Sequence, residues 1–140
     1  MTLEIVANAG SVPWLESFSI GHDRLDHEHR RLIDSFNDFC AFAATTPRPT
    51  RLRENAHALI ATVEAHFASE EAIFPLIGYR HRLSHMREHL DVGNRLHSLL
   101  LNDTGLEPAA AGAAGRLVFV EHILRHDLEV KTWVLHAAGL

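Results

Sequence analysis

The sequence predicts an all-α protein, an up-down-up-down antiparallel four-helix bundle preceded by an irregular N-terminal arm. Apolar residues recur at steps of three and four along four segments of roughly 20 residues, which is the spacing of amphipathic helices. Short links that contain Pro, Gly or Asn separate these segments. No stretch alternates between apolar and polar residues as a half-buried strand does. Four amphipathic helices joined by short links bury their apolar faces against one another as a bundle.

The N-terminal arm is predicted to cover about residues 1–24. This segment holds Pro13, Trp14 and Gly21 without regular apolar spacing, and we expect it to pack on the bundle. The first helix follows over residues 25–43. Its inward face consists of Leu25, His29, Leu32, Phe36, Phe39 and Ala43.

Two more helices are predicted from the same spacing. The link at residues 45–50 contains two prolines, which do not fit a helix interior, and the second helix follows over residues 52–73. A proline and a glycine end that helix, and the third covers residues 85–99 before the polar segment 102–105. The inward faces consist of Leu52, Ala56, Leu59, Val63, His66, Glu70 and Ile73 in the second helix and of His85, His89, Val92, Leu96 and Leu99 in the third.

The fourth helix has an uncertain start. Pro108 stands near the beginning of the segment, and residues 109–115 consist almost entirely of Ala and Gly. This tract is either the first part of the helix or a loop, in which case the helix starts later. The stretch 117–135 is strongly apolar, and one side of it carries Phe119, Ile123, Val130 and Val134.

Length and composition indicate one ordinary globular domain over residues 1–140. The 13 basic and 18 acidic residues give a net charge of −5, which argues against nucleic-acid binding. The single cysteine, Cys40, excludes an internal disulfide framework and a cysteine zinc site. No apolar run reaches the ~18 residues of a membrane span. Residues 1–10 lack a basic leader, so we expect no signal peptide and a cytoplasmic location.

Histidine is unusually frequent, with 12 residues, and several of these occupy core positions of the predicted helices. Residues four apart lie on nearly the same helix face, so His66 with Glu70, and His85 with His89, each point in one direction. A buried Glu without a partner would cost several kcal/mol, so such a group normally pairs with a cation or binds a metal. Any single histidine is compatible with an ordinary hydrogen-bonded or exposed side chain. That interpretation does not account for the same placement on several helices.

The remaining histidines are interpreted mostly as solvated surface residues, and the fourth helix leaves two alternatives. His122 with His126, four residues on, is the simplest ligand pair on a regular helix and is slightly favoured by geometry. Asp127 is five residues from His122, and a π-bulge would bring it nearer. The surface set consists of His22, His27, His57, His81, His97, His126 and His136.

Four motifs resemble those of the hemerythrin family, in the same order along the chain. The similarity runs from Trp14 to about Trp133 and therefore covers most of the sequence. The matching segments are Asp26-His27-Glu28-His29, His66-Phe67-Ala68-Ser69-Glu70-Glu71, Gly78-Tyr79 followed by His85-Met86-Arg87-Glu88-His89, and His122-Ile123-Leu124-Arg125-His126-Asp127.

The resemblance implies a non-haem di-iron centre in a four-helix bundle that binds dioxygen reversibly. It implies that His85, His89 and His122 hold one iron. His29 and His66 would hold the other iron and leave a position open. Glu70 and Asp127 would bridge the two irons together with an oxo or hydroxo group, which favours Asp127 over His126 as the ligand of the fourth helix.

The function expected from this resemblance is that of an oxygen carrier, store or sensor, without catalytic residues and without enzyme activity. Dioxygen or another small diatomic would be the partner, and a protein partner is unknown. The alternatives are a di-iron enzyme with peroxidase, ferroxidase or nitric-oxide chemistry, an iron-sensing or iron-storage domain, and a metal-free bundle. Reversible binding is favoured by apolar residues expected around the site, which are Ile33, Phe36, Val63, Phe67, Phe119 and Ile123.

Overall fold

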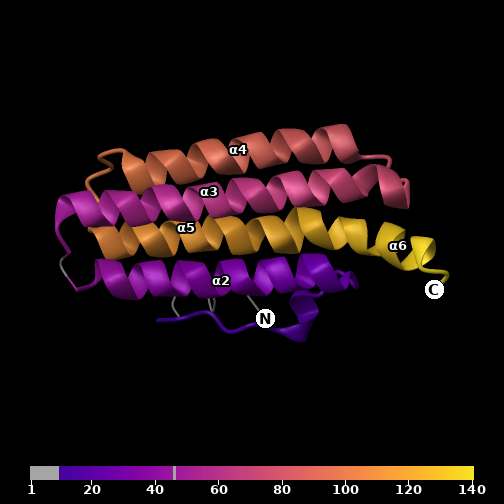
Figure 1. Cartoon of the computed structure of the whole chain (residues 1–140), viewed down its shortest axis with the longest axis horizontal. Coiled ribbons are helices and arrows are strands. Elements are labelled where there is room, and N and C mark those ends of the chain that lie inside the picture. Colours follow the sequence, from indigo (N-terminus) through magenta and orange to yellow (C-terminus); the bar gives the residue numbers. More distant parts are fainter. Residues whose placement is uncertain (1–9, 46) are drawn as a thin grey trace.

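A computed structural model describes residues 10–45 and 47–140, and it forms an antiparallel four-helix bundle, as predicted (Figure 1). Its described residues contain no strand. The predicted lack of a leader concerns residues 1–10, most of which lie outside the described part of the chain. The helices are α2 (Asp23–Ala43), α3 (Pro49–Ile73), α4 (Arg82–Leu101), α5 (Pro108–His122) and α6 (Leu128–Ala137), with 3-10 turns η1 (Glu16–Phe18) and η2 (Phe74–Ile77) and the π-helical segment η3 (Ile123–Asp127).

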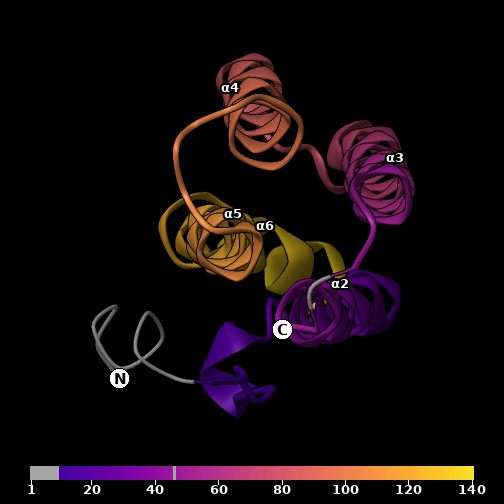
Figure 2. The ribbon, with the colours of Figure 1, turned by 90° about the vertical axis from the view of Figure 1, so that its left-hand side faces the viewer.

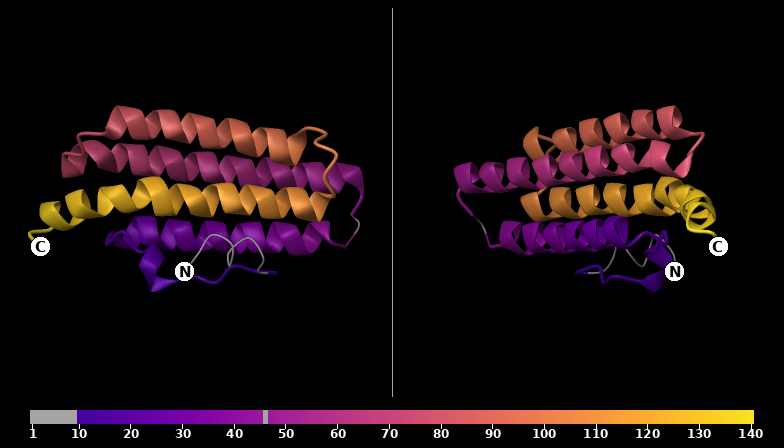
Figure 3. Two further views of the ribbon diagram at one scale, coloured as in Figure 1. Left: turned by 180° about the vertical axis from the view of Figure 1, so that it is seen from behind. Right: turned by 45° about the vertical axis from the view of Figure 1, so that its right-hand side comes forward.

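The bundle has four rods because α5, η3 and α6 follow one another as a single long helix. Seen end on, α2 lies beside α3 and α5, and α4 lies beside the same two helices (Figure 2). The view from behind shows α6 following α5 along the bundle to the C-terminus (Figure 3, left). Every helix therefore turns one face toward a common interior.

Local signals in the sequence explain where the helices begin and end. His22 caps α2, since its Nδ1 accepts a hydrogen bond from the Leu25 amide at 3.3 Å. Asp23 in the first turn complements the helix dipole. Gly78, with φ of 68°, adopts the left-handed conformation that ends η2. None of the helices within the described ranges combines the length and the apolar character needed to cross a membrane.

The Ala/Gly tract is helical, which resolves the alternative that the sequence left open. Helix α5 begins at Pro108, and the tract lies within it. A Cβ atom added at Gly112 would lie 2.9 Å from the ring of Phe39, and one at Gly115 would lie 3.3 Å from Leu96. The glycines therefore allow α5 to approach α2 and α4 closely.

The N-terminal arm packs on the bundle over its described part, as expected. The side chain of Asn37 hydrogen-bonds both the amide (2.9 Å) and the carbonyl (2.7 Å) of Val12. The buried guanidinium of Arg116 donates to Gly10 O at 3.3 Å and to Asn37 Oδ1 at 3.0 Å. Phe18 is fully buried in the main core. Helix α2 starts at Asp23, just before the predicted end of the arm.

Candidate metal centre

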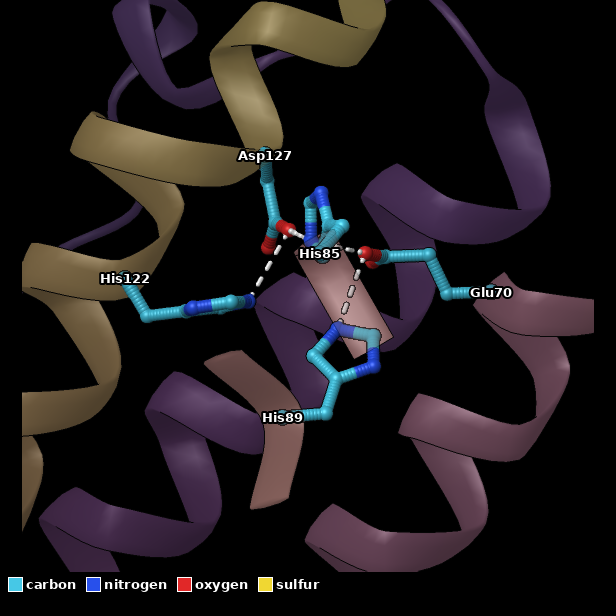
Figure 4. A group of neighbouring side chains, drawn as sticks. All are labelled: Glu70, His85, His89, His122 and Asp127. Carbon is cyan, nitrogen blue, oxygen red and sulfur yellow. Dashed lines mark hydrogen bonds and ion pairs between the residues drawn. The ribbon is translucent and has the colours of Figure 1, made fainter. Parts of the chain in front are cut away.

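The seven predicted ligand side chains lie together in the interior, and all are 0–4% exposed. They come from every rod of the bundle. Figure 4 shows five of them pointing toward one another. Helix α2 contributes His29, α3 contributes His66 and Glu70, α4 contributes His85 and His89, and α5 with η3 contributes His122 and Asp127.

These residues form two groups whose candidate ligand atoms lie within 4.8 Å of one another, and the two groups share both carboxylates. One group combines three imidazoles with the two carboxylates, and the other combines two imidazoles with the same carboxylates. The first consists of Glu70, His85, His89, His122 and Asp127, and the second consists of His29, His66, Glu70 and Asp127.

Each shared carboxylate directs one oxygen at each group. Glu70 Oε1 lies 3.0 Å from His85 Nε2, whereas Glu70 Oε2 lies 3.2 Å from His66 Nε2. Asp127 Oδ1 lies 3.1 Å from His122 Nε2, whereas Asp127 Oδ2 lies 3.1 Å from His29 Nε2. This is the arrangement in which two carboxylates can each connect two cations.

The cluster also contains all the unsatisfied polar side-chain atoms that are buried in the described residues. Nine nitrogen and oxygen atoms of His29, His66, Glu70, His89, His122 and Asp127 have no hydrogen-bond partner. Their distances of 3.1–3.4 Å from other atoms of the cluster therefore bring polar atoms together without hydrogen-bond geometry. An unsatisfied buried polar group costs about 1–3 kcal/mol. Bound cations would satisfy these atoms, so the donor set fits a metal.

The electrostatics of the cluster favour positive charge. Burial alone would raise the pKa of Glu70, but the surrounding imidazoles, first that of His29, hold this pKa well below its usual range. Burial alone would lower the pKa of His29, but Asp127 and Glu70 raise it to about 10. Burial would also lower the pKa of His85, but Asp127 and Glu70 raise it to about 9. Without metal, the imidazoles of His29 and His85 therefore carry protons at neutral pH, and a metal would replace these protons.

A second set of side chains orients the imidazoles from outside. His66 Nδ1 donates to Glu28 Oε1 at 2.7 Å, and His89 Nδ1 donates to Glu71 Oε2 at 2.6 Å. Fixing Nδ1 in this way turns Nε2 toward the interior and makes it a better metal ligand. Tyr79 hydrogen-bonds His85 Nδ1 at 3.3 Å in the same manner.

The sequence did not predict these orienting roles, although Glu28 and Glu71 both lie inside the quoted motifs. Glu28 directly precedes His29 but bonds His66, which is 38 positions away on the next helix. Their position next to a ligand residue was the available signal, but the partner of each depends on how the helices pack.

The π-helical segment shows which residue of the fourth rod, Asp127 or His126, joins His122 in the cluster. Its wider turn between Ile123 and Asp127 brings Asp127 and His122 to the same side, as the bulge alternative required. His126 lies outside the cluster, where its Nε2 is 3.3 Å from Glu88 and its side chain is 33% exposed. The slight geometric preference for His126 was therefore wrong, because it assumed a regular helix.

Apolar rings surround the cluster as expected. Phe119 is fully buried, and its ring centroid is 6.2 Å from that of His29 and 6.3 Å from that of His66. Phe67 stacks on His89 at 3.9 Å. The other expected wall residues are also buried, and the histidines assigned to the surface are exposed except for half-buried His22 and His126.

A family model described as the hemerythrin HHE cation binding domain matches residues 20–134. The matched range contains all seven residues of the cluster. No curated protein matches the chain.

Proposed function

The chain belongs to the hemerythrin family, and we propose that it is a non-haem di-iron protein that binds dioxygen reversibly as a carrier, store or sensor. Family membership and the buried cluster indicate a metal-binding site. The observation that supports the finer proposal is the division of the cluster into two unequal groups that share Glu70 and Asp127. Dioxygen or another small diatomic as the partner, and a cytoplasmic location, belong to the same proposal.

The donor set suits iron. Imidazole and carboxylate are ligands of ferrous and ferric iron, and two shared carboxylates offset part of the buried positive charge. In this proposal His85, His89 and His122 hold one iron, and His29 with His66 hold the other. The second iron would have one protein nitrogen fewer, which would leave room for a small molecule to bind there.

Bound iron would supply the electrons that dioxygen accepts when it binds. The residues of the chain determine how polar the oxygen-binding side of the cluster is and how easily water reaches it. Phe119 lies beside both His29 and His66, which are the imidazoles of the group with fewer ligands. These residues are nearly or fully buried, so water has little access to this side. Excluding water limits the release of reduced oxygen species and supports binding without enzymatic turnover.

The test follows the visible spectrum of the iron-loaded protein through repeated cycles of anaerobic reduction, exposure to air and removal of oxygen. The proposal expects a colour that appears with oxygen and disappears with its removal, at constant iron content. Bleaching with release of peroxide would instead indicate a di-iron enzyme. Oxidation of iron that oxygen removal does not reverse would indicate ferroxidase or storage chemistry. The matched control is His97→Gln, which changes an exposed histidine outside the cluster.

A further inference from the structure

Metal can reach the buried cluster only through its walls, and one side of the bundle offers a polar approach. This inference rests on the proposal that the cluster binds metal. A surface cavity of about 180 Å³ reaches the cluster residue His85 from outside. Water occupies ~30 Å³ per molecule in the liquid, so a hydrated divalent ion fits this space. The cavity is lined by Tyr79, His81, Ser84, His85, His126 and Glu129.

The chemistry of this cavity suits a transition-metal cation. His81 and Glu129 are exposed, and the side chain of neither forms a hydrogen bond or an ion pair with another described residue. His126 is one-third exposed and contributes a second imidazole, whose Nε2 lies 3.3 Å from the carboxylate of Glu88. No Lys or Arg lines the cavity. Imidazole and carboxylate groups are therefore available to a cation without a competing fixed positive charge.

A neighbouring cavity of about 270 Å³ reaches His122, but its charges do not favour a cation. Two acidic residues, Glu88 and Glu121, and two basic residues, Arg95 and Arg125, line it. Arg125 pairs with Glu121 at 3.2 Å, and Glu88 pairs with His126 at 3.3 Å. The basic and acidic groups balance, so this cavity lacks the net attraction of the first.

His126 connects the outer cavity with the buried cluster. Its ring centroid is 6.2 Å from that of His85 and 5.4 Å from that of His122. His81 lines the same cavity and is exposed to solvent. The imidazoles thus form a succession of donors from the surface to the interior.

We propose that three side chains lining this cavity, His81, His126 and Glu129, form an outer site that attracts a hydrated divalent metal ion through its water shell and passes it to His85 in the cluster. The outer site acts on the rate of loading. The equilibrium iron content is set by the buried ligands. A carboxylate and two imidazoles raise the local concentration of a cation, and such attraction increases association rates by about 10–10³-fold.

The test is anaerobic loading of the metal-free protein with ferrous iron in a stopped-flow instrument. Trp133 is a built-in probe because its ring centroid is 6.3 Å from that of His81, so a paramagnetic ion held there quenches its fluorescence. The proposal expects rapid, concentration-dependent quenching followed by slower loading of the cluster. The triple variant His81→Gln, His126→Gln, Glu129→Gln should lose the rapid phase and load at least about tenfold more slowly to the same final iron content.

The chain offers a matched control. His97 and Glu64 form another exposed histidine–carboxylate pair, 3.2 Å apart across α4 and α3, and neither lines the cavity. The variant His97→Gln, Glu64→Gln should load at the rate of the unaltered protein. Loading of the triple variant at that same rate, or equal slowing of the control, would overturn the proposal. Failure of the unaltered protein to take up iron would overturn the proposed function as well.

Discussion

The substitution Asp127→Asn probes the residue that connects the two ligand groups while preserving its size. The carboxylate is fully buried and lies 2.9–3.1 Å from ring nitrogens of His29, His85 and His122. An amide nitrogen is no metal ligand, so the variant keeps one oxygen that can face only one of the two groups. We expect it to be purified with one iron or none.

The structure also gives the size of the effect on stability. Removing one partner of a buried charge network costs about 3–5 kcal/mol. In a chain near this length, each kcal/mol lowers the melting temperature by roughly 2–4 °C, so the metal-free variant should melt about 6–20 °C lower than the metal-free unaltered protein. His126→Gln is the neighbouring comparison. Its pair with Glu88 is partly exposed and contributes about 0–1 kcal/mol, or at most about 4 °C.

The assay combines iron analysis of the purified variants with thermal denaturation followed by circular dichroism, before and after iron removal. The two variants should differ clearly in iron content and melting temperature, because Asp127 is buried whereas its neighbour His126 is partly exposed. If His126→Gln failed to retain iron after prolonged loading while Asp127→Asn retained two, the assignment of the fourth rod would be wrong.

Iron removal should lower the melting temperature clearly, because it leaves buried polar atoms without partners; equal melting of both forms would contradict this. Glu71→Gln should weaken iron binding about 10–100-fold in a chelator competition by loosening His89, whereas Glu64→Gln should not. In the metal-free protein the pKa values of His29 (about 10) and His85 (about 9) lie above the unfolded value of 6.5. Their stabilisation is therefore complete below pH 6.5 and lost as the pH rises to about 9–10, which urea titrations at several pH values would measure; unchanged stability over this range would refute it.

The sequence was sufficient to predict the bundle from its apolar spacing and the residues of the cluster from its four motifs. Spacing of three and four residues identified the helices, because that period places side chains on one face irrespective of what they contact. The same period put His66 with Glu70, and His85 with His89, on the inward faces, where the structure has them. These faces come together because the four rods pack around a common interior.

Other features depended on packing between helices, which spacing does not contain. The Ala/Gly tract was ambiguous because Gly112 is unfavourable in an isolated helix, and only the nearness of Phe39 explains it. Asp127 reaches the cluster through a π-helical turn, and spacing arguments that assume a regular helix do not predict such a turn. The partners of Glu28 and Glu71 likewise depend on which helices become neighbours.

The central claim, two irons held by unequal sets of histidines and shared carboxylates, is tested most directly by anomalous X-ray diffraction. Crystals of the iron-loaded protein would be measured at the iron absorption edge. The account predicts two anomalous peaks inside the bundle, one bonded to His85, His89 and His122 and the other bonded to His29 and His66, with Glu70 and Asp127 contacting both. A single peak, or two peaks that do not share these carboxylates, would contradict it.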